Sequence, residues 1–233
     1  ETKLYAGIFE GALKICQEML EFSTLPEHFS EAYNCFDNYY RERGEIRKSI
    51  EMIEKKLDVI KERDFVNLGK IFSMDVIAYR YTSIGQFDKA LEILQTIDEE
   101  IIEFLKDETI FNYINIYYEL KDVKKLQDVI ISVEDLIKYD PYFYHKEKLY
   151  YTKGLLNELE ENYVEAIENH RKALEFDETA LPQLLGLARC YRLNGEIKQA
   201  RDYMDRALNL FPYVGEARYE SALIFAENGQ IDN

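Results

Sequence analysis

The stretch LLGLARCYRLNGEIKQARDYMDRALNLFP, residues 184–212, decides the fold that we expect for this chain. Apolar residues recur in it every three or four positions, which is the period of an α-helix. Gly195 interrupts the pattern where one helix would end, and glycine readily adopts the left-handed conformation that ends many helices. Ala188, Ala200 and Ala207 are small enough to let the two flanking helices approach closely. The stretch therefore predicts a helix–turn–helix hairpin.

The same hairpin pattern occurs 34 residues earlier, in YYTKGLLNELEENYVEAIENHRKALEFDE, residues 150–178. With this offset, small residues align with small residues and bulky ones with bulky ones: Gly154 with Ala188, Tyr163 with Ile197, Ala166 with Ala200, Ala173 with Ala207 and Leu174 with Leu208. Self-similarity at a fixed period of this size is typical of a repeat architecture, in which each hairpin packs on its neighbours.

Further copies extend over almost the whole chain. Glycine, any residue and an apolar residue open a predicted second helix at Gly7, Gly44, Gly85, Gly195 and Gly229, whereas side chains replace the glycine in turns near Lys121 and Glu161. We expect helices near residues 8–22, 28–43, 45–63, 65–84, 86–105, 108–120, 122–138, 143–160, 162–176, 181–194, 196–210 and 213–228. All four prolines fall at helix junctions, where a missing N–H costs least.

The order of residues in these copies resembles the tetratricopeptide repeat. The copy that matches best does so through Leu184, Leu187, Ala188, Tyr191, Gly195, Ile197, Ala200, Met204, Ala207, Leu208 and Pro212. The preceding copy matches through Tyr150, Gly154, Tyr163, Ala166, Ala173 and Leu174, but has Asn157 and His170 where aromatic residues are usual. A third copy matches through Met74, Ile77, Ala78, Tyr81, Gly85, Phe87, Ala90 and Leu94. The resemblance implies an all-α fold, a right-handed superhelical solenoid of about six to seven helix–turn–helix repeats.

We expect one solenoid over residues 1–233, because no linker or low-complexity segment separates the copies. Its approximate repeats are 1–29 (partial), 30–70, 71–106, 107–146, 147–180, 181–214 and 215–233 (partial). The chain begins at Glu1 without a Met and stops at Asn233, soon after the start of a predicted helix. We therefore expect it to be a fragment of a longer chain.

The composition narrows the class of function. A net charge of -16 argues against binding to nucleic acid, which requires a basic face. No apolar run approaches the roughly eighteen residues of a membrane span, so we expect no membrane insertion. The sequence has no glycine-rich phosphate loop, no nucleophile motif and no HExxH pair. We therefore predict a non-enzymatic protein with no catalytic residues, no cofactor and no metal site.

The three cysteines, Cys16, Cys35 and Cys190, lie where the helical pattern predicts small or apolar side chains. Their number is odd, and no two have the Cys-x-x-Cys spacing. We expect buried, reduced thiols rather than a disulfide or metal ligands. The absence of paired cysteines favours a reducing compartment, so we expect a cytoplasmic protein.

In tetratricopeptide arrays the first helix of each hairpin lines a concave face, and the resemblance implies the same here. Counting along each first helix gives these candidate binding residues: Asn34, Asn38, Arg41, Asp75, Tyr79, Asn112, Asn115, Tyr118, Lys148, Tyr151, Arg189 and Arg192. A carboxamide donates and accepts hydrogen bonds at once, which matches the backbone of an extended peptide. Peptide-sensing tetratricopeptide receptors of bacteria use inward asparagines in this way. The alternatives are asparagines that face only water and tyrosines that pack within the repeats.

These observations predict a non-enzymatic interaction module that binds a protein or an extended peptide segment on the concave face. The acidic charge predicts a partner with basic character, steered electrostatically and weakened by salt. The alternative is a peptide-sensing regulatory domain that controls an effector domain outside this sequence. The sequence leaves the oligomeric state open.

Overall fold

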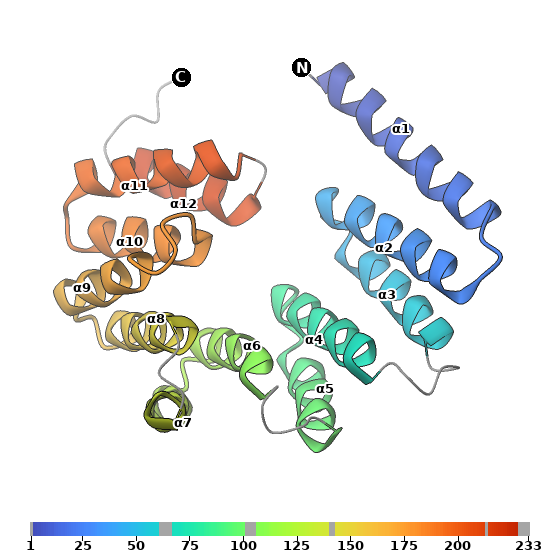
Figure 1. The fold of residues 1–233 in the computed structure, drawn as a ribbon. Coiled ribbons are helices and arrows are strands. Elements are labelled where there is room, and N and C mark those ends of the chain that lie inside the picture. The colour runs from blue at the N-terminus through green and yellow to red at the C-terminus, as the bar shows by residue number, and fades with distance from the viewer. Residues whose placement is uncertain (1, 61–66, 101–105, 140–142, 213, 228–233) are drawn as a thin grey trace. The chain divides into compact units, whose positions relative to one another are not determined.

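The structure, a computed structural model, describes residues 2–60, 67–100, 106–139, 143–212 and 214–227. All regular secondary structure in these ranges is helical, as the all-α prediction requires (Figure 1). In chain order the helices are α1 (Thr2–Glu21), α2 (Pro26–Glu42), α3 (Ile46–Ile60), α4 (Asn67–Ser83), α5 (Phe87–Glu100), α6 (Lys106–Glu119), α7 (Val123–Tyr139), α8 (Phe143–Leu159), α9 (Tyr163–Leu174), α10 (Leu181–Leu193), α11 (Ile197–Leu210) and α12 (Gly215–Glu227).

Each of these helices corresponds to one that the sequence predicts, and the largest difference is in the first. The prediction that a helix opens at Gly7 was wrong, because α1 continues through this glycine. Residues 2–6 contain no proline or second glycine to end the helix, and a single glycine inside a helix costs only about 1 kcal/mol. The predicted opening at Gly229 lies outside the described residues.

The turns between helices confirm the prediction about glycine and its substitutes. Gly44, Gly85 and Gly195 have φ angles of 72°, 71° and 80°. Lys121 and Glu161 occupy the same left-handed region, with φ angles of 54° and 61°. The turn conformation is therefore repeated even where the glycine is not, at the steric cost that a side chain incurs there.

Replacing Glu161 by glycine is expected to raise the free energy of unfolding by about 0.5–1 kcal/mol. Relief of the left-handed side-chain strain exceeds the entropy that the more flexible glycine adds to the unfolded chain. Urea unfolding followed by circular dichroism measures the change. The control is Gly195→Ala, which places a side chain in the same conformation and should change stability in the opposite direction.

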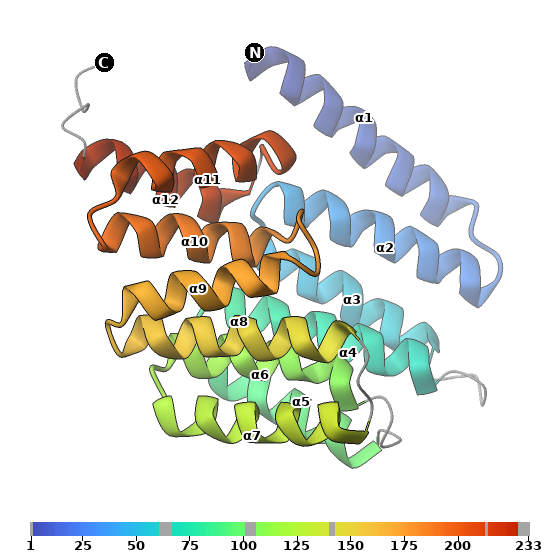
Figure 2. The same ribbon diagram turned by 60° about the vertical axis from the view of Figure 1, so that its left-hand side comes forward.

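The chain divides into two compact units, Glu1–Tyr113 and Ile114–Asn233. In the first unit, α1 packs on α2, α2 on α3, α3 on α4 and α4 on α5. In the second, α7 to α12 do the same, and α10 also contacts α8 and α12, the first helices of the neighbouring hairpins (Figure 2). Hairpins that stack on their sequence neighbours form an α-helical repeat solenoid.

The core of the Ile114–Asn233 unit follows the small-and-bulky pattern of the sequence. Ala166, Ala188 and Ala200 are fully buried at helix contacts, and Leu184 and Leu187 fill the space between them. Small side chains let the helices approach, and the leucines supply the apolar area whose burial stabilises the stack.

The expectation of three reduced cysteines was wrong for two of them. Cys16 on α1 and Cys35 on α2 form a disulfide, with a Cα–Cα distance of 5.5 Å. Helical spacing could not show this pairing, because the two cysteines belong to different helices and meet only after the hairpin forms. Cys190 is a free, buried thiol, as predicted.

Candidate functional site

All twelve predicted binding residues lie on helices that come first in a hairpin. Asn34, Asn38 and Arg41 are on α2, Asp75 and Tyr79 on α4, Asn112, Asn115 and Tyr118 on α6, Lys148 and Tyr151 on α8, and Arg189 and Arg192 on α10. They belong to both units, and their surroundings differ between the two.

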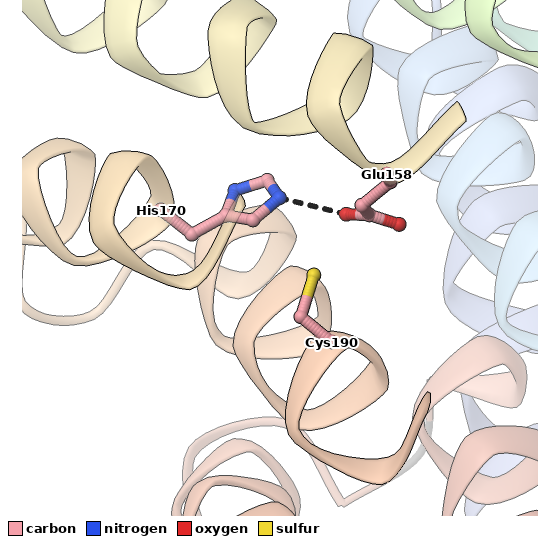
Figure 3. Close-up of side chains that lie close together, drawn as sticks. All are labelled: Glu158, His170 and Cys190. Atoms are coloured by element: carbon pink, nitrogen blue, oxygen red, sulfur yellow. Dashed lines mark hydrogen bonds and ion pairs between the residues drawn. The ribbon is translucent and has the colours of Figure 1, made fainter. Parts of the chain in front are cut away.

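In the Ile114–Asn233 unit, polar side chains converge on the carboxylate of Glu158, near the C-terminal end of α8. His170 Nε2 on α9 contacts one oxygen at 2.7 Å (Figure 3). Arg189 on α10 donates from Nε and Nη2 to the two oxygens at 2.6 and 3.1 Å. Tyr118 Oη on α6 donates at 2.9 Å. These four residues, the Glu158 cluster, join four helices through one buried carboxylate.

Electrostatics keep this carboxylate ionised. Burial alone would raise the pKa of Glu158, but the Arg189 guanidinium and the hydrogen bond from His170 outweigh it and lower that pKa to about 2. Burial raises the pKa of the Tyr118 hydroxyl, which remains a neutral donor. Within the described residues, His170 Nδ1 has no hydrogen-bond partner, which fits the tautomer that carries its proton on Nε2.

The His170 ring lies between two glycines of neighbouring first helices and is fully buried. A Cβ at Gly154 of α8 would lie 2.6 Å from His170 Cε1, and one at Gly186 of α10 would lie 2.8 Å from it. Both separations are far below van der Waals contact. The two glycines therefore make the space in which the ring reaches Glu158.

The thiol of Cys190 on α10 lies beside this hydrogen bond (Figure 3). The ligand atoms of Glu158, His170 and Cys190 lie within 4.8 Å of one another, and Zn²⁺ accepts such a donor set. However, both carboxylate oxygens already accept hydrogen bonds from Arg189, whose charge would repel a metal ion at this place. Burial also raises the pKa of the Cys190 thiol, which opposes formation of a thiolate ligand. The contacts favour a structural network over a metal centre.

The Glu158 cluster predicts a loss of stability in acid. Because the pKa of Glu158 is lower in the folded chain than in the unfolded one, the cluster stabilises fully above about pH 4.5 and progressively less towards pH 2. The loss amounts to about 3 kcal/mol. Urea unfolding at pH 7, 5 and 3 should register about 2 kcal/mol of this loss, because the rest occurs below pH 3. A Glu158→Gln variant, which has nothing to titrate there, should lose less over the same interval, and equal losses would contradict the assignment.

The predicted site did not include Glu158 or His170. In the sequence, His170 is visible only as a departure from the repeat pattern, and Glu158 as one of several acidic residues near a helix end. Gly154 and Gly186 were the available signal: two small residues on successive first helices leave room for a larger side chain from the helix between them.

Several other predicted residues of this unit are held inside it. Lys148 is fully buried and Tyr151 is 6% exposed, so neither is available at the surface. Tyr151 Oη donates a hydrogen bond to Asn115 Oδ1 at 3.3 Å. Arg192 Nε donates to Glu220 Oε1 on α12 at 2.6 Å. These side chains join neighbouring first helices, as those of the Glu158 cluster do.

In the Glu1–Tyr113 unit, the structure separates the predicted residues into engaged and accessible ones. Asn112 is 4% exposed and donates from Nδ2 to Asp75 Oδ1 at 2.6 Å. Arg41 pairs with the adjacent Glu42 at the surface. The predicted residues Asn112 and Asn115 are therefore both engaged in hydrogen bonds within the chain.

Asn34, Asn38 and Tyr79 remain accessible. Asn38 is exposed and Asn34 half-buried, and among the described residues neither carboxamide has a hydrogen-bond partner. Tyr79 is 48% exposed on α4, and Phe72, seven residues earlier, is 49% exposed. Seven residues are close to two helical turns, so these rings lie on one face of α4.

Comparison with curated proteins gives no match. In the part of the chain that the structure describes, no helix combines the length and apolar character that a membrane span requires. A family model described as tetratricopeptide repeat matches residues 159–223, which include most of α9 to α12.

Solved structures of repeat proteins share the fold. A thermophilic tetratricopeptide-repeat protein of Thermus thermophilus superposes with a TM-score of 0.60 at 17% identity, over 84% of this chain and 99% of that one. A tetratricopeptide-repeat protein of Parabacteroides merdae gives a TM-score of 0.57 at 13% identity, over 95% and 87%. The APC/C hetero-tetramer Cut9–Hcn1 gives 0.59 at 16% identity, over 97% of this chain and 41% of that one. Together with the repeated hairpins and their left-handed turns, these findings show that residues 159–223 match the tetratricopeptide repeat and that the chain has the fold of an α-helical repeat solenoid.

Proposed function

We propose that this chain is a non-enzymatic protein-interaction module and that α2 and α4 of the Glu1–Tyr113 unit bind an extended segment of a partner protein. The helical-repeat fold supports the general role, because stacked hairpins present a long surface of side chains on a rigid scaffold. The observation that carries the specific role is that Asn34 and Asn38 are unengaged while exposed aromatic rings lie on α4.

The chemistry of these four side chains suits an extended peptide. Asn34 and Asn38 are four residues apart and therefore share a face of α2. Each carboxamide offers one acceptor and two donors, enough to bind the C=O and N–H groups of a backbone. Phe72 and Tyr79 offer apolar area for a side chain of the same segment, and aromatic rings lose little conformational freedom on binding.

A buried polar contact fixes α2 beside α4. Arg80 Nη2 lies 3.7 Å from Asp37 Oδ1, and Arg80 Nε donates to Ser49 Oγ at 3.2 Å. Asn38 and Tyr79 are the sequence neighbours of Asp37 and Arg80. The Arg80 guanidinium also lies 5.6 Å from the centroid of the Tyr79 ring. A surface held in this way loses little entropy when a partner binds.

The charge of the chain supports a basic partner. At a net charge of -16, long-range attraction favours segments rich in lysine and arginine. Because such attraction is screened by ions, affinity should fall as the salt concentration rises from low to physiological. Affinity that does not change with salt would contradict the basic character of the partner but not the binding surface.

The test begins with the selection of random linear peptides that bind the purified chain. Fluorescence anisotropy then measures the Kd of an enriched peptide. The variant Asn34→Ala/Asn38→Ala and the variant Tyr79→Ala should each raise Kd about tenfold, which corresponds to roughly 1.4 kcal/mol. The control is Gln17→Ala/Gln95→Ala, which removes two exposed carboxamides from α1 and α5 and should leave Kd unchanged. Equal Kd values for all variants would place binding elsewhere, and a failure to enrich any peptide would contradict peptide binding.

A further inference from the structure

The disulfide between Cys16 and Cys35 joins α1 to α2 in the Glu1–Tyr113 unit. Figure 1 shows α1 lying beside α2, and the two helices share an apolar cluster. In this cluster Cys16 is fully buried, and Phe36 and Tyr39 of α2 are less than a tenth exposed. The covalent bond therefore lies inside the contact that holds α1 in place.

Apart from this contact, little holds α1. Among the described residues, α2 is the one helix that α1 has as a neighbour. Outside this contact, Ile15 and Met19 of α1 are 56% and 38% exposed, and Phe22 beyond its end is 76% exposed. A helix packed on one side has low local stability. A covalent link therefore contributes a large share of the free energy that keeps α1 docked on α2.

The two cysteines of the disulfide differ in their exposure to solvent. Cys35 is partly exposed, whereas Cys16 is fully buried. A reductant in solution therefore reaches the bond from the Cys35 side. The third cysteine, Cys190, is buried in the other unit, where burial raises the pKa of its thiol. A thiol in that state reacts slowly, which restricts thiol–disulfide exchange to the pair.

We propose that Cys16 and Cys35 form a thiol–disulfide latch that controls the docking of α1 on α2. In the oxidised state α1 stays docked and covers Phe36 and Tyr39. In the reduced state α1 separates more often from α2 and exposes this apolar surface. The proposal does not rest on the proposed peptide binding, because it concerns a different side of α2.

The chemistry requires a dithiol of the thioredoxin class as reductant. One thiolate of the dithiol attacks Cys35 Sγ, the Cys16–Cys35 bond breaks, and Cys16 leaves as a thiolate that takes up a proton. The second thiol of the dithiol then attacks the mixed disulfide and releases Cys35. Two electrons and two protons pass to the cysteine pair, and the dithiol becomes a disulfide. The same exchange in reverse, with a disulfide oxidant of this class, closes the latch.

Two measurements on the whole chain test the latch. Alkylation of the denatured, unreduced protein followed by mass spectrometry should find Cys190 as its one free thiol, and all three cysteines after reduction. Hydrogen exchange should then be about tenfold or more faster in α1 after reduction with a dithiol, with α4 and α10 unchanged. A Cys16→Ser/Cys35→Ser variant should exchange at the reduced rate with or without reductant, and a Cys190→Ala control should respond as the wild type does.

Three results would overturn the proposal. Three alkylated cysteines in the protein treated with a disulfide oxidant would mean that the bond does not form. Equal exchange of α1 in the two states would mean that the bond does not control docking. Loss of protection throughout α2, α3 and α4 on reduction would show that the bond supports the whole unit rather than a latch. Because the wild type itself is reduced, this last result is distinguishable from misfolding of a variant.

Discussion

Replacing Glu158 by glutamine is expected to lower the free energy of unfolding by about 3 kcal/mol. Glutamine has the shape of glutamate but no charge, so the Arg189 guanidinium loses its counter-ion in a site where its side chain is only 20% exposed. Glutamine also presents an NH₂ group where the carboxylate accepted hydrogen bonds from both Arg189 and His170. Because part of the Arg189 side chain still contacts water, the expected loss is at the lower end of the range for a broken buried ion pair.

Urea unfolding measures the total loss, and hydrogen exchange of α8 to α10 locates it. The matched control is Glu168→Gln on α9, which breaks the pair between Glu168 and Lys172 at the surface. This pair is exposed and screened by water, so its removal should have no measurable effect. If the two variants are equally stable, the Glu158 cluster does not hold the four helices together.

Replacing Gly154 by alanine is expected to destabilise the chain by about 2–3 kcal/mol, although alanine is the better helix former. The added methyl group would lie 2.6 Å from the His170 ring, which is buried and cannot move into solvent without leaving Glu158. Gly11→Ala in α1 is the control, since nothing lies within 4 Å of that position. It should stabilise by about 0.5–1 kcal/mol, so the two substitutions should have opposite signs.

A double-mutant cycle separates the clash from other effects of the methyl group. His170→Ala removes the ring that Gly154→Ala would strike, so the double variant should lose less stability than the sum of the two single losses. Coupling of about 1 kcal/mol or more is expected for residues in direct contact. Additive losses would show that the methyl group is harmful for a reason unrelated to His170.

The fold was predictable because its determinants are local and repeated. Alanines at fixed offsets marked the close helix contacts, and Gly195 marked a turn whose φ of 80° few other residues adopt readily. Once one hairpin was recognised, the register carried over to copies in which Lys121 and Glu161 replace the glycine. At Gly7 this reasoning failed. Glycine followed by any residue and an apolar residue does not by itself make a turn when helix formers surround it.

The site was less predictable because its contacts join residues far apart in the sequence. Counting along first helices found Tyr118 and Arg189, since their positions follow from the repeat. It could not find Glu158 as their common partner, because that pairing depends on the rotamers of side chains from three helices. The Cys16–Cys35 bond escaped for the same reason.

The placement of His170 between Gly154 and Gly186 limits how the sequence can evolve. An alanine at either glycine is harmful while the histidine is present, and a smaller residue at 170 leaves a void and removes one hydrogen bond from the Glu158 carboxylate while the glycines are present. Single substitutions therefore pass through less stable intermediates, whichever changes first. Lineages that leave this arrangement would have to change the three positions nearly together, so the effect of each substitution depends on the residues already at the other two.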